Sequence, residues 1–260
     1  MSRALFTAAT GMLAQERKID VIANNLANVN TDGFKGSRAE FQDLMYQTLR
    51  AAGAGGSALR STATGTQVGL GVKDGAIVRD FSQGAFKNTG KSTDVAISGS
   101  GFFVVRLDDG SYRLTRNGAF RVSAQGELVT KDGHPLWPIV QVPLERAGLA
   151  IGADGSVEAI LPQGERRLLG ALQVAEVRNV DALEATGDNL FSIADFDLNV
   201  TLTQPGQNGT GRLEAGFLEG SNVKVVEEMI AMITGQRAYE ANSRVIQTAD
   251  RMMEETNRLR

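Results

Sequence analysis

Residues 21–35, VIANNLANVNTDGFK, place four asparagines within ten positions near the predicted end of an amphipathic helix. Asparagine competes with the helix backbone for hydrogen bonds and is disfavoured in helix interiors. An apolar face with helical spacing nevertheless runs through the stretch, formed by Ile19, Ile22, Leu26 and Val29. We therefore expect the helix to be cut off within this stretch.

The residues that follow have the chemistry of a turn. Asn30, Thr31 and Asp32 can form side-chain turns that leave Gly33 free to take a positive φ. Phe34 would then anchor the exit of the chain. Two interpretations stay open, because the amides could simply cap and end the helix of their own chain or could bond neighbouring subunits.

Glycine separates two helical ends from the middle of the chain. Only Gly11 precedes Gly33 and only Gly235 follows Gly220, whereas glycine interrupts the middle every few residues. This distribution predicts helical ends that flank a β-rich centre. Residues 51–71, AAGAGGSALRSTATGTQVGLG, are small, polar and flexible in composition, which predicts a linker or extended loop.

Each helical end carries an apolar seam. The seams include Leu5, Met12, Ile19 and Leu26 at the N-terminus and Val226, Ile230, Ile233, Val245 and Met252 at the C-terminus. Ser221 or Asn222 is the expected N-cap of the C-terminal helix, which spans roughly 50 Å at about 1.5 Å per residue. The helices could cover their seams on the β centre, but their position at opposite ends of the chain favours pairing with each other or with other copies.

The centre of the sequence alternates strand-like runs with turn signals. The turn dipeptides are Asp109-Gly110, Asn117-Gly118, Gln125-Gly126, Asp132-Gly133 and Asp154-Gly155. Such dipeptides favour tight hairpins, and no long helical period lies between them to suggest a parallel α/β sheet. The expected fold class is α+β, with long N- and C-terminal helices forming a coiled coil and a central, mainly antiparallel β domain.

No group of residues in the sequence supports catalysis, a cofactor or a metal. The chain has one histidine, His134, and no cysteine, so it lacks the ligands of a transition-metal site. The glycines of SGSGF, residues 98–102, lead into a strand, which fits neither a nucleophile elbow nor a dinucleotide loop. We predict that the protein is not an enzyme.

Composition also argues against two classes of partner. A net charge of -3 with scattered basic residues gives no footprint for nucleic acid. No apolar run reaches the roughly 18 to 20 residues that a membrane helix requires, so we expect no membrane insertion. MSRALFTAATGMLAQ, residues 1–15, continues as an amphipathic helix, which predicts mature sequence without a cleavable signal peptide.

The stretch ANNLANVNTDGFK, residues 23–35, resembles the N-terminal signature of the flagellar basal-body rod and hook proteins, where a helix with paired asparagines ends in an N-x-x-T-x-G-F/Y-K turn. Its signature positions are Asn24, Asn25, Asn28, Asn30, Thr31, Gly33, Phe34 and Lys35. Residues 216–253 resemble the matching C-terminal signature, and SGSGFFVV, RNGAFRVSAQGELVT and DGHPL are similar to the central region of rod members. Chain length, ALFTAATGMLAQ and FQDLMYQTLRAAGAGG are most similar to distal rod subunits, with proximal rod subunits and hook proteins as alternatives.

The resemblance implies a structural subunit of an axial tube, exported unfolded through the flagellar type III apparatus and polymerised by its terminal helices. The implied partners are further copies, other rod and hook-side proteins, the surrounding ring proteins and the export apparatus. The implied location is a basal body that spans the periplasm to the outer membrane. An alternative from another class is a periplasmic or surface module whose β centre holds a carbohydrate or peptide near Trp137.

On this basis we expect three layers. Residues 1–36 and 221–260 would form an inner coiled-coil layer. Residues 37–85 and 200–220 would form an extended connecting layer, and residues 86–199 would form an outer β domain.

Overall fold

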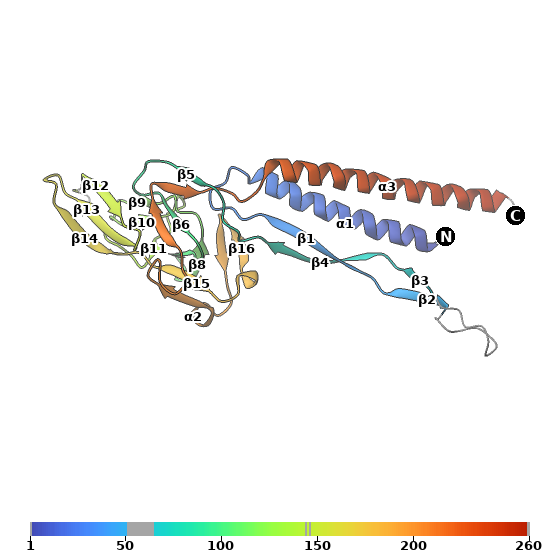
Figure 1. The fold of residues 1–260 in the computed structure, drawn as a ribbon, viewed down its shortest axis with the longest axis horizontal. Coiled ribbons are helices and arrows are strands. Elements are labelled where there is room, and N and C mark those ends of the chain that lie inside the picture. The colour runs from blue at the N-terminus through green and yellow to red at the C-terminus, as the bar shows by residue number, and fades with distance from the viewer. Residues whose placement is uncertain (1, 51–64, 144, 146, 259–260) are drawn as a thin grey trace. The chain divides into compact units, whose positions relative to one another are not determined.

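The computed structural model describes residues 2–50, 65–143, 145 and 147–258 (Figure 1). The chain forms two compact units. The first consists of Met1–Ala27, Ser37–Arg79 and Lys224–Arg260, and the second of Asn28–Gly36 and Asp80–Val223. The predicted linker falls largely outside the described residues, because residues 51–64 are not among them.

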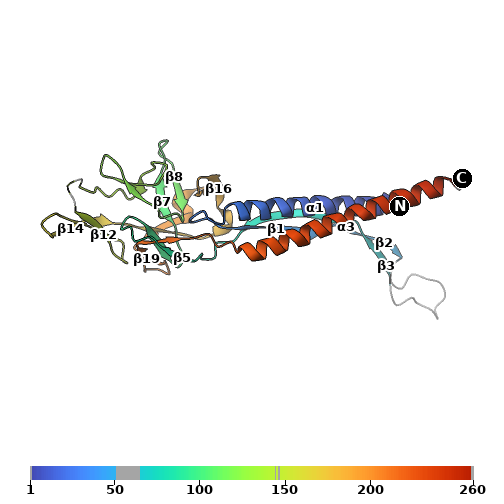
Figure 2. The same cartoon turned by 90° about the horizontal axis from the view of Figure 1, so that it is seen from above.

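Two long helices and two antiparallel strand pairs build the first unit. Its elements are α1 (Ser2–Ala27), α3 (Val225–Arg258), β1 (Ser37–Asp43), β2 (Tyr46–Arg50), β3 (Thr66–Gly69) and β4 (Val72–Arg79). β1 pairs with β4 and β2 pairs with β3. α1 packs along α3, as Figures 1 and 2 show from two directions, and it also contacts β1 and β4.

The two helices meet where their side chains are small. Gly235 and Ala249 are the buried residues of α3. A Cβ atom on Gly235 would lie 3.2 Å from Cγ1 of Ile19, and one on Gly11 would lie 2.9 Å from Nδ2 of Asn242. Because Gly11 and Gly235 have no side chain, the backbones of α1 and α3 can approach closely at these positions.

Short strands and tight turns build the second unit. Its strands are β5 (Phe86–Asn88), β6 (Val95–Ser98), β7 (Phe103–Arg106), β8 (Tyr112–Thr115), β9 (Arg121–Val122), β10 (Leu128–Val129), β11 (Leu136–Trp137), β12 (Gly148–Ile151), β13 (Ser156–Ile160), β14 (Arg166–Ala171), β15 (Val174–Val177), β16 (Glu184–Gly187), β17 (Leu190–Ser192), β18 (Val200–Thr203), β19 (Arg212–Ala215) and β20 (Phe217–Glu219). A 3₁₀ turn, Val180–Ala182, and the short helix α2 (Phe196–Asn199) interrupt them. The largest sheet has the order β11-β7-β8-β17-β16, and β12-β13-β14 form a second one.

Strand β7 and the residue before it explain how the second unit is packed. Successive side chains on a strand point to opposite faces. Phe103 and Val105 accordingly belong to one buried cluster, whereas Phe102 and Val104 belong to another. The stretch is buried on both faces, which explains why GFFVV is continuously apolar. The predicted α+β class with a mainly antiparallel centre is confirmed.

Four of the five predicted turn dipeptides close the same kind of hairpin. At Asp109-Gly110 the Leu107 amide donates to the Ser111 carbonyl at 2.9 Å, and the Gly110 amide donates to the Leu107 carbonyl at 3.0 Å. Gly110 has a φ of +82°. Equivalent backbone bonds and a positive φ recur at Gly126, Gly133 and Gly155. This is the three-residue hairpin loop that requires a left-handed residue.

The hairpin prediction is wrong for Asn117-Gly118. Its flanking strands do not pair with each other, since β8 pairs with β7 and β17 while β9 pairs with β10. The Gly118 carbonyl instead accepts from the Val95 amide at 3.0 Å. A Cβ atom on Gly118 would lie 1.6 Å from the Val95 carbonyl oxygen, so glycine is needed for close approach of two chain segments.

Two further predictions need correction. Thr66–Gly69, expected within the linker, is strand β3 and is held by its pairing with β2. Neither Ser221 nor Asn222 caps α3, because the helix begins at Val225 and the Lys224 carbonyl accepts from the Glu228 amide at 3.1 Å. The side chain of Asn222 is used in the other unit, where its Oδ1 accepts from the Gly36 amide at 2.8 Å.

Candidate assembly site

Asn25, in the last turns of α1, is a buried polar residue that is 3% exposed. Its Oδ1 accepts from the Ser37 amide at 2.9 Å, and its Nδ2 donates to the Ser37 carbonyl at 2.7 Å. Nδ2 also donates to Oε1 of Glu228 at 2.9 Å. One amide therefore joins α1, β1 and α3 within a single chain.

The turn that follows α1 is closed by Asn28 and Thr31. The Thr31 amide donates to the Asn28 carbonyl at 3.1 Å, and Thr31 Oγ1 donates to Asn28 Oδ1 at 3.2 Å. The Phe34 amide then donates to the Thr31 carbonyl at 3.3 Å. Asn24 and Asn30 have exposed side chains. These contacts are local, which is why turn chemistry could be predicted from the sequence.

Gly33 has the positive φ expected from the sequence, at +75°. Its amide donates to the Glu219 carbonyl at 2.7 Å, so the turn is bonded to strand β20. A Cβ atom at this position would lie 2.6 Å from the Asn117 amide nitrogen. Glycine is required here for its conformation and for the approach of a second backbone segment.

Lys35, the last signature residue, is buried and 1% exposed. Its Nζ donates to Oε1 of Glu219 at 2.6 Å and to the Ser82 carbonyl at 2.7 Å. Arg116 Nη1 donates to the other carboxylate oxygen of Glu219 at 3.3 Å. Burial lowers the pKa of Lys35, and the hydrogen bond that Lys35 donates to Glu219 opposes that effect. Burial likewise lowers the pKa of Arg116.

Sequence reasoning did not single out Arg116 or Glu219. Both lie in stretches quoted for the family resemblance, RNGAFRVSAQGELVT and GFLEGSN. Neither stretch carries a local pattern that predicts burial of a charged side chain. Their positions in the resembling stretches were the one available signal.

The predicted seam residues of α3 lie on its exposed side. Their side chains are between 46% and 69% exposed for Val226, Ile230, Ile233, Val245 and Met252. Val225, Met229 and Tyr239 are also exposed. We refer to Val225, Val226, Met229, Ile230 and Ile233 as the outer pad of α3. The pad gathers five large apolar side chains within nine residues of one helix.

The predicted seam residues of α1 are half-buried. This holds for Leu5, Met12, Ile19 and Leu26, of which Ile19 lies against Gly235 of α3. The more deeply buried apolar residues of α1 are Ala8, Ala14 and Ile22. Phe6 and Leu13 remain more than half exposed, so α1 also presents apolar surface that its own chain does not cover.

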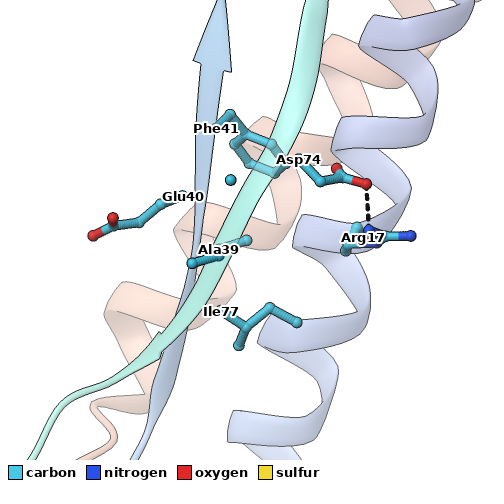
Figure 3. A pocket seen from close by; sticks show the side chains of 8 residues that line it. Arg17, Ala39, Glu40, Phe41, Asp74 and Ile77 are labelled. Carbon is cyan, nitrogen blue, oxygen red and sulfur yellow. Dashed lines mark hydrogen bonds and ion pairs between the residues drawn. The ribbon is translucent and has the colours of Figure 1, made fainter. Parts of the chain in front are cut away.

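A hollow of about 260 Å³ lies beside α1 in the same unit (Figure 3). Arg17 of α1 forms an ion pair with Asp74 of β4 at its edge, and Phe41 and Ile77 supply apolar lining. The Glu40 carboxylate and the small residues Ala39, Gly75 and Ala76 complete its lining.

Trp137, the anchor of the alternative binding module, lies in β11 and is half-buried. Its ring centroid is 5.5 Å from that of Tyr112, and the Arg106 guanidinium lies 6.0 Å from it. Within the described part of the chain, no group of three or more possible metal ligands is clustered. No helix of that part combines the length and hydrophobicity needed to cross a bilayer.

Comparison with family models defines the class of the protein. Residues 5–35 match the model described as "Flagella basal body rod protein". Residues 96–159 match "Flagellar hook protein FlgE/F/G D1 domain", and residues 214–259 match "Flagellar basal body rod FlgEFG protein C-terminal". The class is therefore that of the axial proteins of the flagellum, as the resemblance predicted.

Comparison with curated relatives identifies the protein family within this class. The chain is 43% identical to flagellar basal-body rod protein FlgG of Buchnera aphidicola subsp. Schizaphis graminum, covering 100% of both chains. It is 44% identical to FlgG of Caulobacter vibrioides, covering 99% of both, and 32% identical to FlgF of the same organism, covering 95% of this chain and 93% of that one. The chain belongs to the flagellar basal-body rod protein family. It is a structural component of the flagellar basal body.

Proposed function

We propose that the chain is a structural subunit of the distal rod and that it polymerises through its terminal helices. The greater identity to FlgG than to FlgF supports the assignment to the distal rod. The observation that carries the assembly mechanism is the outer pad of α3. Its five large apolar side chains stay exposed although the opposite side of the helix already packs on α1.

Burial of this pad would drive the addition of each subunit. Apolar surface removed from water contributes about 25 cal/mol per Å². A neighbouring copy, presenting its own terminal helices, is the covering surface that a helical array supplies at every position. The predicted seams and the coiled coil belong to this proposal, and the packing of α1 along α3 supports it.

The three-layer arrangement remains part of the proposal. Residues 1–36 and 221–260 form its inner layer, residues 37–85 and 200–220 its connecting layer, and residues 86–199 its outer β domain. The helical character of both chain ends supports the inner layer. The β-rich character of the centre supports the outer one.

We further propose the partners and route that the resemblance implies. The partners are further copies, other rod and hook-side proteins, surrounding ring proteins and the type III export apparatus. The rod would span the periplasm to the outer membrane.

The assembly mechanism is tested by replacing one apolar residue of the outer pad. Ile230→Asp puts a charge where the proposal needs burial, and Gln247→Asp puts the same charge at an exposed polar position of the same helix. We expect Ile230→Asp to abolish motility and rod extension in a strain lacking the chain, and Gln247→Asp to restore both.

Circular dichroism and limited proteolysis of the purified Ile230→Asp chain check that its β-rich unit stays folded. Leu26→Asp, in the half-buried seam of α1, should give the same loss of assembly. Rods of normal length built from Ile230→Asp subunits would overturn the mechanism.

A further inference from the structure

Three charged side chains that are distant in sequence are buried together in the second unit. Lys35 lies in the N-terminal turn, Arg116 follows strand β8, and Glu219 ends strand β20. The side chains of Lys35 and Glu219 are 0% and 1% exposed, and that of Arg116 is 5% exposed. We call these three residues the charge latch. Assembly through the terminal helices makes no use of it.

Glu219 is the centre of the charge latch. Its Oε1 accepts from Lys35 Nζ and, at 3.0 Å, from the Gly84 amide, while its Oε2 accepts from Arg116. The Lys35 ammonium is also bonded to the Ser82 carbonyl. The carboxylate therefore holds the N-terminal turn, residues 82–84 and Arg116 around one point.

Within the three residues of the latch one carboxylate serves two cations, and the Asp80 carboxylate outside the latch also favours the charged form of Lys35. The Arg116 guanidinium carbon lies 5.1 Å from the centroid of the Phe102 ring, which offers it a weak second partner. Its Nε has no hydrogen-bond partner among the described residues. A buried charge that loses its partner is strongly destabilising. Loss of the Glu219 charge would leave two buried cations without a carboxylate partner in the latch.

We propose that the charge latch makes order in the N-terminal turn, residues 28–36, conditional on the presence of strand β20. Without the Glu219 carboxylate, burial of Lys35 and Arg116 is unfavourable and the turn is released. Lys35 and Glu219 are 184 residues apart in sequence. If export is as proposed above, a chain that emerges end first cannot close the latch until both residues are outside, so this unit stays open during transport.

The proposal is tested with isosteric changes in the full-length, unassembled chain. Glu219→Gln keeps an oxygen that can accept from Lys35 and Gly84 but removes the charge. Lys35→Met removes one cation and leaves the Arg116–Glu219 pair balanced. The matched control is Lys87→Met, which removes the cation of an exposed ion pair of the same unit; its Nζ lies 2.8 Å from Oδ1 of Asp32.

Hydrogen–deuterium exchange reads out the latch at the amides of Gly33 and Gly84, which donate to Glu219. Glu219→Gln should accelerate exchange there by on the order of a hundredfold, with a much smaller change in β13. Lys35→Met should have the smaller effect, and adding it to Glu219→Gln should slow the exchange again, because one stranded cation is removed.

Either of two results would overturn the proposal. One is equal acceleration at Gly33 and in β13, which would show general destabilisation. The other is additive effects of the two substitutions, which would show that hydrogen bonds and packing act without regard to charge balance. Because the measurement uses unassembled chains, a negative result leaves the rod assignment unaffected.

Discussion

Gly33 meets three structural requirements of the N-terminal turn at a single position. It has a φ of +75°, its amide donates to the Glu219 carbonyl, and a Cβ atom would lie only 2.6 Å from the Asn117 amide nitrogen. Left-handed backbone costs an ordinary residue roughly 1–2 kcal/mol. Contact with another backbone segment adds to that cost, because backbone cannot move aside as the end of a flexible side chain can.

Gly33→Ala should therefore lower the free energy of unfolding of the second unit by about 3 kcal/mol, the sum of strain and displaced backbone. Gly110→Ala is the matched control, since Gly110 has a φ of +82° but, among the described residues other than its chain neighbours, no atom lies within 4 Å of the position of its Cβ. That control should lose only about 1 kcal/mol. Urea denaturation of both variants measures the difference, and equal losses would contradict the role of the Asn117 contact.

Asp109 gives a prediction of pH dependence at the same scale. The Ser111 hydroxyl donates to its Oδ1 at 2.6 Å and the Ser111 amide at 2.8 Å, and these bonds hold the pKa of Asp109 below its ordinary value of 3.8. A carboxylate whose pKa is lowered by folding stabilises the fold above the unfolded value. The contribution is lost as pH falls through the folded value.

Ser111→Ala should raise the pKa of Asp109 toward its ordinary value. The pKa of Asp154, lowered by the equivalent Ser156 contacts, should stay unchanged in the same variant and serves as an internal control. Carboxyl chemical shifts followed by NMR between pH 2 and pH 6 would show both. An unmoved Asp109 titration would mean that the hydroxyl is not the cause.

Residue-scale prediction from sequence succeeded where the interaction was local. The positive φ of Gly33 followed from the turn residues before it, and Asn28 and Thr31 bond to each other across three positions. The burial of Lys35 could not be predicted, because its partner is 184 residues away. Asn25 was selected as a signature residue, but its hydrogen bond to Glu228 spans 203 residues and could not be predicted from the sequence either.

At the scale of elements, one face of α3 packs on α1 and the other face is exposed. Gly235 lies against Ile19 of α1, whereas the outer pad stays exposed. Apolar periodicity predicted both helices, since it depends only on spacing along the chain. It could not show which apolar column meets α1, because glycine and alanine carry little weight in such a pattern although they allow the closest approach.

Gly235→Val should force α1 and α3 apart, because even a Cβ would lie 3.2 Å from Ile19. Overpacking typically costs about 1–3 kcal/mol, which outweighs the gain in helix propensity on replacing glycine. Gln236→Val adds the same side chain at the adjacent exposed position and should have little effect. Thermal unfolding followed by far-ultraviolet circular dichroism compares them, and superimposable melts would contradict close packing at Gly235.

Turn dipeptides predicted most of the hairpins in the centre because these loops, like the positive φ of Gly33, depend on interactions that are local in sequence. Gly110, Gly126, Gly133 and Gly155 each complete a loop defined by its own few residues. Asn117-Gly118 failed because its glycine serves a contact with Val95, which no local pattern encodes. The sheet order β11-β7-β8-β17-β16 also depends on pairing between distant segments.

At the scale of the whole molecule, the two units differ in where they place their large apolar side chains. The first unit keeps large apolar side chains on exposed helix faces, whereas the second buries two clusters around β7 and closes its turns with glycine. This contrast fits a subunit that is self-sufficient in its β-rich part and relies on neighbours for its helices. Family membership then assigns those neighbours to the flagellar basal body.

Electron microscopy of basal bodies from a strain lacking the chain tests the central claim most directly. The strain is complemented with the wild-type chain, with Ile230→Asp or with Gln247→Asp. We predict inner rings without a distal rod or hook in the uncomplemented strain and in the strain carrying Ile230→Asp, and complete rods and hooks with the other two chains. Complete rods with hooks in the uncomplemented strain would contradict the assignment to the distal rod.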